Sequence, residues 1–235
     1  MKKRILIPLI IAAVIIAGAF IYLSDYSRAD TYAAGMLKSD DTVKVSQEEY
    51  GWFFDGPSDD AVCVFYPGGK VEETAYSPLL HRLAAQGVDS CVLKMPLKLA
   101  FFDIDKADVF LENHHYKKVY LAGHSLGGVA AAAYAAGNPG SADGLILLAS
   151  YPAEKLDDSL ETVLIYGSGD GVLNTEKLEN SKPLLPPGTK EYIIDGGNHA
   201  QFGSYGPQKH DGKATISPGE QISETVDIIL RTIND

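Results

Sequence analysis

The sequence predicts an α/β fold in which a mostly parallel, twisted sheet is flanked by helices. Short apolar runs bounded by turn residues alternate with stretches of helical periodicity, a pattern typical of a parallel sheet with crossover helices. No segment repeats with a period of about 20 to 50 residues, and no Ser/Gly-rich linker interrupts residues 42–235. We therefore expect those residues to form one domain.

The expected strands of the parallel sheet are apolar along their whole length. They are Ala61–Tyr66, Val88–Leu93, Lys118–Ala122, Gly144–Ala149, Thr162–Tyr166 and Glu191–Ile194. Helical patterns accompany them at Ala75–Gln86, Lys106–His115, Gly127–Ala136 and Gly219–Ile233. Before the first of these strands, Thr42–Gln47 and Tyr50–Asp55 alternate in a way that suits an antiparallel pair, so the sheet is expected to be mixed.

The first 24 residues differ in kind from the rest. They carry a charge of +3, which leaves −14 on the other 211 residues of a chain whose net charge is −11. Residues 5–23 are an uncharged stretch of 19 residues, long enough as a helix to span a hydrocarbon layer of about 30 Å. Cations before the stretch and Asp25 after it predict residues 1–4 in the cytoplasm and the main domain outside.

A cleaved signal peptide is the alternative to this transmembrane anchor. Ala17-Gly18-Ala19 is a small-x-small site, and cleavage after Ala19 would give a secreted protein. We favour the uncleaved anchor because apolar residues continue through Leu23. We therefore expect a single-pass protein of the cell membrane with its domain extracytoplasmic, and residues 24–41 as a tether or a short irregular helix.

Composition excludes some partners and cofactors. Asp and Glu outnumber Lys and Arg by 31 to 20, the wrong sign for a phosphate-binding surface, so we expect no nucleic-acid partner. The two cysteines, Cys63 and Cys91, fall in successive predicted strands and lack the spacing of a metal site or a redox pair. A disulfide is conceivable in an exported protein, but we favour free thiols in the core. No metal or cofactor is expected.

The clearest motif is Gly123-His124-Ser125-Leu126-Gly127, which lies between a predicted strand and an alanine-rich helical stretch. Gly-x-Ser-x-Gly at such a turn holds the serine in a strained conformation, and its glycines remove side chains that would collide with the neighbouring strand and helix. The motif predicts Ser125 as a nucleophile at the carboxyl edge of the sheet. We expect His124 to point away from the base and to have a packing role.

A nucleophilic serine needs a base, and the base needs an orienting acid. In hydrolases with this motif the acid and then the histidine follow the serine along the chain, each on a loop after a strand. Asp170 follows the predicted strand Thr162–Tyr166, and His199 follows Glu191–Ile194. We therefore predict Asp170 as the acid and His199 as the base, with Asp195 as the competing acid.

An oxyanion hole in this arrangement combines the N–H after the nucleophile with one from the loop after an earlier strand. Leu126 supplies the first. Tyr66-Pro67-Gly68-Gly69-Lys70 ends the strand that begins at Ala61, and its glycines allow the backbone to approach a substrate. We expect Gly69 to supply the second N–H, with Lys70 the next candidate.

Taken together, the sequence from about Asp41 to Ile233 resembles the α/β-hydrolase superfamily, and more closely its small bacterial "alpha/beta hydrolase fold-5" family. The resemblance rests on motifs at 66–71, 94–97, 99–102, 123–128, 149–152 and 196–203. It implies the α/β-hydrolase fold with Ser125, Asp170 and His199 in the roles given above, and it leaves the substrates open. The segment Tyr205–Gly212 matches less well, because His210 stands where we would expect glycine.

The spacing of the motifs also predicts an open site. About a dozen residues, Ser150–Glu161, separate two predicted strands at the place where related enzymes insert a cap domain, too few for a cap. Four aromatic residues are candidates to line the substrate pocket, although such positions are as often ordinary core: Phe101, Phe102, Tyr151 and Phe202.

We therefore expect a membrane-tethered serine hydrolase, a carboxylesterase or related acyl hydrolase that acts on a small-molecule ester. The alternative is a non-catalytic envelope protein that retains the fold for binding.

Overall fold

The computed structural model describes residues 2–234, except for the side chains at 2–7, 9, 12, 16, 21 and 23. One eight-stranded sheet runs through the molecule in the order β1-β2-β4-β3-β5-β6-β7-β8. The strands are β1 (Lys44–Gln47), β2 (Gly51–Asp55), β3 (Ala61–Tyr66), β4 (Val88–Leu93), β5 (Lys118–His124), β6 (Gly144–Leu148), β7 (Glu161–Gly167) and β8 (Lys190–Ile194). From β4 to β8 all pairs are parallel, and β2 pairs antiparallel with both β1 and β4.

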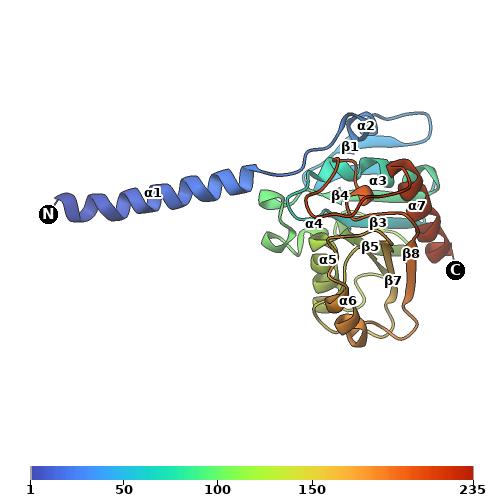
Figure 1. Ribbon diagram of the computed structural model, residues 1–235. Coiled ribbons are helices and arrows are strands. Elements are labelled where there is room, and N and C mark those ends of the chain that lie inside the picture. The colour runs from blue at the N-terminus through green and yellow to red at the C-terminus, as the bar shows by residue number, and fades with distance from the viewer. Residues whose placement is uncertain (1, 235) are drawn as a thin grey trace.

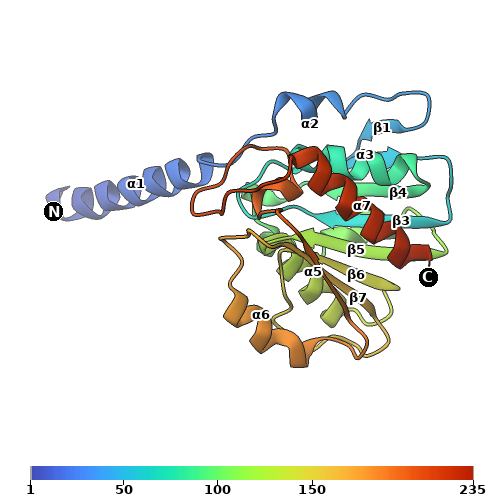
Figure 2. The same cartoon turned by 45° about the vertical axis from the view of Figure 1, so that its right-hand side comes forward.

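Helices cover both faces of this sheet (Figures 1 and 2). On one face lie α3 (Ser77–Ala85) and α7 (Pro218–Asn234), and on the other α4 (Lys106–Leu111), α5 (Leu126–Gly137) and α6 (Thr175–Ser181). Each face has its own apolar core, because β3 is buried along its whole length and alternates its side chains between the two. This is the α/β-hydrolase architecture that the sequence predicts.

The two cysteines lie on opposite faces of the sheet and are free. Burial raises the pKa of the Cys63 thiol to about 12 and holds that of Cys91 well above its ordinary value. Both are therefore unreactive core residues at neutral pH, as expected from the sequence.

Most strands lie within two residues of their predicted positions, while the helices differ more. The helix expected from Ala75 begins at Ser77, because Glu73–Tyr76 form a 3₁₀ turn instead. α6 was not predicted at all, since its sequence is mostly polar and has one buried apolar residue, Leu178. The Asn174 side chain caps it by accepting a hydrogen bond from the Lys177 N–H at 2.8 Å.

Part of the predicted tether packs onto the domain. Within it, α2 (Thr31–Gly35) is capped by Asp30, and Ala33 is fully buried. The Ser77 hydroxyl donates to the Ala33 carbonyl at 2.6 Å, and the Asp30 N–H donates to the Ser204 carbonyl at 2.9 Å. These long-range hydrogen bonds, which no local pattern reveals, fix this segment in place.

The first helix, α1 (Lys2–Ser24), projects from the edge of the domain at which the parallel strands end (Figure 1). The Ser27 N–H donates to the Lys70 carbonyl and the Glu72 N–H donates to the Ser27 carbonyl, both at 2.8 Å. Among the described residues no helix meets the combination of length and apolarity that crossing a membrane requires. Eight side chains of the predicted anchor, at 5–7, 9, 12, 16, 21 and 23, lie outside the described residues.

Candidate active site

Ser125 occupies the sharp turn between β5 and α5, with φ of 53° and ψ of −123°. This left-handed φ is rare for a residue with a side chain. A Cβ on Gly127 would lie 2.2 Å from the Tyr66 carbonyl oxygen, and one on Gly123 would lie 2.6 Å from the Gly127 carbonyl. The turn closes only because both positions are glycine, which is the physical reason for the motif.

Hydrogen bonds from the next strand hold the backbone of Ser125 in this conformation. Its N–H donates to the Leu148 carbonyl at 2.9 Å, and its carbonyl accepts from the Ser150 hydroxyl at 2.8 Å. The Ser125 hydroxyl itself has no hydrogen-bond partner in the described part of the chain. Ser150, whose side chain fixes this turn, is a supporting residue that the sequence analysis did not single out.

Asp170 and His199 are in direct contact at the same edge of the sheet. His199 Nδ1 lies 2.8 Å from Asp170 Oδ2, and both side chains are about 2% exposed. Asp170 Oδ1 accepts from the N–H groups of Val172 and Leu173 at 2.8 and 2.7 Å. An ionised carboxylate only accepts hydrogen bonds, so His199 carries its proton on Nδ1 and leaves Nε2 as an acceptor.

The loops that carry these two residues are joined by backbone hydrogen bonds. The Ser168 N–H donates to the Ile194 carbonyl at 2.9 Å and the Gly169 N–H donates to the Gly197 carbonyl at 2.8 Å. Asp195, the competing acid, is exposed and accepts from the Ser168 hydroxyl at 3.2 Å. The geometry therefore pairs His199 with Asp170.

His124 lies against His199, with ring centroids 4.5 Å apart, so the expectation that it points away from the base is wrong. β5 extends through His124, which places its side chain on the same face as Tyr120 and Ala122. Its Nδ1 lies 2.8 Å from the Tyr76 hydroxyl. Burial, with a smaller contribution from His199, holds the pKa of His124 well below its ordinary value, so this ring is neutral at pH 7.

The hydrogen bond that would join Ser125 to His199 is not formed. His199 Nε2 is buried, and within the described residues it has no hydrogen-bond partner. The structure thus brings Asp170 and His199 together and places Ser125 beside His124, whose ring contacts His199.

Gly69 and Leu126, the two residues expected to form the oxyanion hole, lie side by side. A Cβ on Gly69 would lie 2.8 Å from Leu126 Cδ2, so these residues are in close contact. Along the loop, Gly68 donates to the Tyr76 hydroxyl, Lys70 to the Lys98 carbonyl and Val71 to the Gly68 carbonyl. In the described structure the N–H groups of Gly69 and Leu126 have no acceptor. Of the two candidates in this loop, Gly69 therefore has the available N–H, and that of Lys70 is occupied.

The four aromatic candidates have different environments. Phe101 and Phe102 are 47% and 62% exposed, and Tyr151 is half-buried. Phe202 is 1% exposed and packs in the core with its ring 5.6 Å from that of His124, so it lines no open pocket. The β6–β7 connection, residues 149–160, contains no helix or strand, and no cap covers this edge.

Asp211 is a supporting residue that the sequence analysis missed. Its Oδ1 accepts from the N–H groups of Gly171 and His199 at 3.1 and 3.2 Å, and its Oδ2 accepts from the Ala200 N–H at 2.8 Å. It therefore links the Asp170 loop to the His199 loop. His210 beside it has a φ of 69°, which explains why glycine is expected there.

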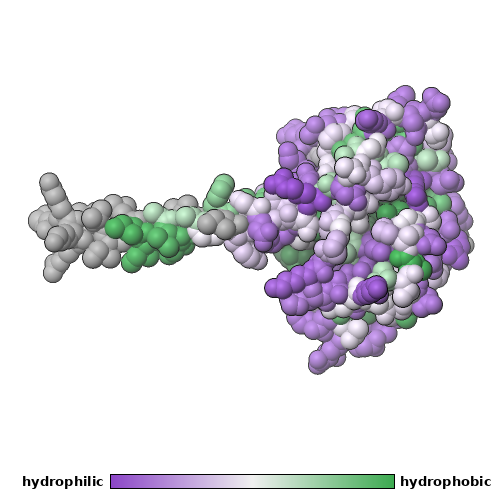
Figure 3. Space-filling model, turned by 45° about the horizontal axis from the view of Figure 1, so that its top comes forward, coloured by the Kyte–Doolittle hydropathy of each residue, from purple (hydrophilic) through white to green (hydrophobic). Residues whose placement is uncertain are grey.

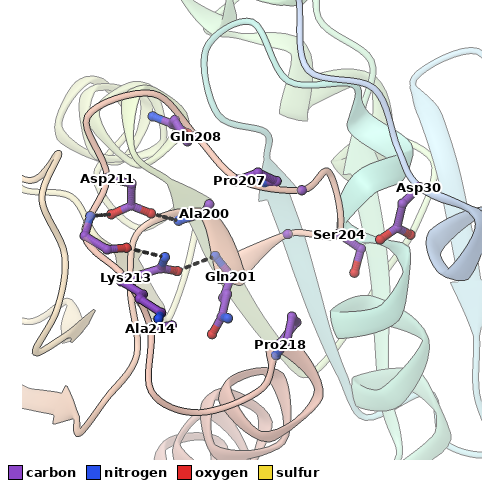
Figure 4. Close-up of a pocket in the computed structure, with 14 residues that line it drawn as sticks. Asp30, Ala200, Gln201, Ser204, Pro207, Gln208, Asp211, Lys213, Ala214 and Pro218 are labelled. Atoms are coloured by element: carbon purple, nitrogen blue, oxygen red, sulfur yellow. Dashed lines mark hydrogen bonds between the residues drawn. The ribbon is translucent and has the colours of Figure 1, made fainter.

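Asp211 and Ala200 also line a pocket of about 510 Å³ (Figure 4). It is lined by residues of the 198–218 segment together with Asp30, and Ser125 is not part of it. The figure shows Asp211 directed at Ala200 on the wall of this pocket. The pocket is therefore separate from the proposed nucleophile.

A group of carboxylates lies elsewhere. Oxygens of Asp55, Asp59 and Asp89 come within 4.8 Å of one another near the amino end of β4, the opposite edge of the sheet from Ser125. Asp89 already accepts from the Gly56 N–H and the Tyr116 hydroxyl, both at 2.7 Å. These contacts give the cluster a structural role in joining β2, β4 and the segment before β5.

Comparison with known proteins agrees with this fold. The profile of the alpha/beta hydrolase family matches residues 62–223, well over half of the chain. The chain belongs to the alpha/beta hydrolase family, and this membership supports a hydrolase. No curated protein matches the sequence.

Solved structures share the fold at low sequence identity. A bacterial membrane phospholipase A is 15% identical, with a TM-score of 0.61 and coverage of 99% of this chain and 100% of that one. Est1E from Butyrivibrio proteoclasticus is 15% identical, with a TM-score of 0.56 over 83% of this chain and all of that one. The esterase Est2 from Thermogutta terrifontis is 15% identical, with a TM-score of 0.56 over 84% and 93%.

Proposed function

We propose that this protein is a serine hydrolase, a carboxylesterase or related acyl hydrolase, that acts through Ser125, His199 and Asp170. The observation that carries the proposal is the buried Asp170–His199 pair, whose orienting hydrogen bond leaves His199 Nε2 unpaired at the edge where Ser125 lies. An acceptor nitrogen kept buried without a partner costs stability, which a catalytic role explains.

The chemistry follows from these groups. Ser125 Oγ attacks the ester carbonyl while His199 Nε2 takes the hydroxyl proton, and Asp170 stabilises the resulting imidazolium. The N–H groups of Gly69 and Leu126 donate to the carbonyl oxygen as it becomes an oxyanion. Collapse of the tetrahedral intermediate breaks the bond to the alcohol, which takes the proton from His199. Water then attacks the acyl-enzyme by the same steps and releases the acid.

The missing Ser125–His199 hydrogen bond is compatible with this mechanism, because catalytic hydrogen bonds are often unformed until substrate binds. It is also the observation that favours the second candidate, a non-catalytic envelope protein that uses the same fold for binding. The two candidates differ in whether Ser125 reacts.

The proposal includes the location of the domain. An anchor over residues 5–23 would hold it outside the cytoplasm at the cell membrane, and cleavage after Ala19 would release it. The +3 charge at the N-terminus and the uncharged residues that follow support export in either case. Expression with a reporter fused to the C-terminus, followed by protease access to intact cells, tests this part.

Hydrolysis of p-nitrophenyl acetate by purified full-length protein tests the activity. Ser125→Ala is expected to lower the rate by at least about 1,000-fold. Ser58→Ala, at the opposite edge of the sheet, is the matched control and should retain the wild-type rate. A Ser125→Ala protein as active as wild type would overturn the proposal. A panel of acyl chain lengths, thioesters, lactones and peptides then defines the reaction subtype.

A further inference from the structure

Exposed apolar side chains gather around the opening at Ser125. Outside α1, the described residues include six large apolar side chains that are exposed. Two of them, Tyr32 and Ile193, are isolated. The other four lie in the loop after β4 or at the first residue of α5, at the carboxyl edge of the sheet, and are Leu97, Phe101, Phe102 and Leu126, exposed by 53%, 47%, 62% and 37%. Exposed apolar side chains that gather in one place, unlike scattered single ones, mark an interaction surface.

The loop that presents three of these side chains is joined to the site. The Lys70 N–H donates to the Lys98 carbonyl at 2.8 Å, which ties this loop to the Gly69 turn. The 3₁₀ turn Ala100–Phe102 packs against α5, the helix that begins directly after Ser125. The four side chains, which we call the apolar rim, therefore border the entrance to Ser125.

Specific contacts hold the backbone at Leu97 in the apolar rim. Leu97 and Lys98 both have left-handed backbones, with φ of 53° and 58°. The Lys98 ammonium pairs with the buried carboxylate of Glu73, and the Lys98 N–H donates to the Met95 carbonyl at 3.2 Å. A backbone strained to this extent persists only where surrounding contacts enforce it, so the exposure of Leu97 is built into the fold.

The first helix leaves the domain beside the same rim. Ser27 forms a parallel bridge with Val71, three residues after Gly68 in the loop at the site. The ammonium of Lys70 lies 4.0 Å from the ring centroid of Tyr22 in α1, and that of Lys98 lies 5.5 Å from the ring of Tyr26. Figure 3 shows a hydrophobic strip along α1 that projects from a mainly hydrophilic face of the domain.

The charge near the rim differs from that of the whole domain. Residues 25–235 carry −14, yet residues 90–102 contain Lys94 and Lys98 and no acid. Lys70 and Arg28 lie beside the same loop and the base of α1. Lys98 pairs with Glu73 and Lys70 lies 3.9 Å from Asp25, so two of these four cations are balanced by carboxylates. Exposed apolar side chains beside cations and paired charges match the interface of a lipid bilayer.

We propose that the Ser125 entrance faces the lipid bilayer, with Leu97, Phe101 and Phe102 inserted at the interface, and that the substrate is an ester of a membrane amphiphile. The inference rests on the proposed function. α1 leaves the domain on the side where the apolar rim lies. A helix embedded in the bilayer would therefore bring the rim to the membrane surface. An open site without a cap then receives its substrate from the lipid phase.

Tryptophan fluorescence tests the position of the rim. Full-length Phe102→Trp and its control Ile193→Trp are compared in vesicles of phosphatidylcholine and phosphatidylglycerol with brominated acyl chains, against the background of the single native Trp52. Ile193 is 55% exposed on β8, away from the rim. The inference predicts quenching of the Phe102→Trp signal beyond wild type and none for Ile193→Trp. Equal quenching of the two, or no added quenching of either, would overturn it.

Substrate preference gives the second test. Leu97→Asn suits the left-handed backbone, because asparagine tolerates that conformation. We expect this variant to hydrolyse a fluorogenic phospholipid ester in vesicles roughly five- to tenfold more slowly than wild type, with p-nitrophenyl acetate hydrolysis unchanged. Ile193→Asn should leave both rates unchanged. An equal effect of Leu97→Asn on both substrates contradicts the inference, whereas wild-type protein inactive on both contradicts the proposed function.

Discussion

The two halves of the candidate site are built in different ways. Ser125 is positioned by residues close to it in sequence, in one continuous strand, turn and helix whose glycines permit backbone contact. Asp170 and His199 are on separate loops that are 29 residues apart, and long-range hydrogen bonds through Asp211 join them. The first half is a local backbone arrangement, and the second is a side-chain network.

This difference decides what each half can tolerate. A side chain added to the Ser125 turn collides with backbone that cannot move, so it lowers the free energy of unfolding. Removal of a polar group from the Asp170–His199 half leaves the sheet intact but loosens two loops, so it mainly lowers kcat. The predictions below test this contrast, beginning with the largest effect.

Gly127→Ala is expected to have the largest effect, because its Cβ would lie 2.2 Å from the Tyr66 carbonyl oxygen. We expect a loss of about 3 kcal/mol or more in the free energy of unfolding, and loss of esterase activity. Gly137→Ala at the other end of the same helix is the control, since nothing lies within 4 Å of its Cβ, and it should be neutral or slightly stabilising. Urea unfolding followed by circular dichroism measures both. Equal stability of the two variants would contradict the account.

Asp170→Asn should leave the fold intact and lower kcat by about 10⁴-fold, since asparagine no longer holds His199 in the productive tautomer. Asp195→Asn is the matched control, because Asp195 is exposed and contacts Ser168 rather than His199. Steady-state kinetics with p-nitrophenyl acetate compare them. A larger loss for Asp195→Asn than for Asp170→Asn would reassign the acid.

Asp211→Asn is expected to lower kcat by roughly 10- to 100-fold with KM little changed. The substitution replaces one of the two acceptor oxygens by an NH₂ group, which cannot accept from the loop N–H groups. The exposed Asp227 on α7 provides the control Asp227→Asn. If the role of Asp211 were purely structural, the variant would have a lower free energy of unfolding, and its folded fraction would keep the wild-type kcat. Unfolding and kinetics are therefore measured on the same preparation.

Most of the fold and the Ser125 half could be predicted from the sequence, because strand positions follow from apolar runs and the turn from a short motif. Asp170 and His199 could be predicted from their order along the chain, but their support could not. Asp211 lies in a polar loop and contacts Gly171, 40 residues earlier, and no local pattern encodes that pairing. His124 was misplaced because β5 continues two residues beyond the apolar run and includes it.

The smallest predicted effect concerns pH and His124. This buried histidine has a lowered pKa in the native state, so the unfolded chain binds a proton below about pH 6.5 that the native protein does not. The free energy of unfolding should therefore fall as pH decreases below that value, with His124 contributing up to about 1.4 kcal/mol per pH unit. His124→Asn should reduce this slope, and denaturant unfolding between pH 7 and pH 5 measures it. An unchanged slope would show that another group is responsible.

Covalent labelling tests most directly the central claim that Ser125 is an activated nucleophile. Folded full-length protein is treated with a fluorophosphonate probe, and the modified peptide is identified by mass spectrometry. The account predicts one adduct on Ser125, absent from Ser125→Ala and strongly slowed in His199→Asn. Folded protein that remains unlabelled at Ser125 would contradict it and would favour a binding role for this hydrolase fold.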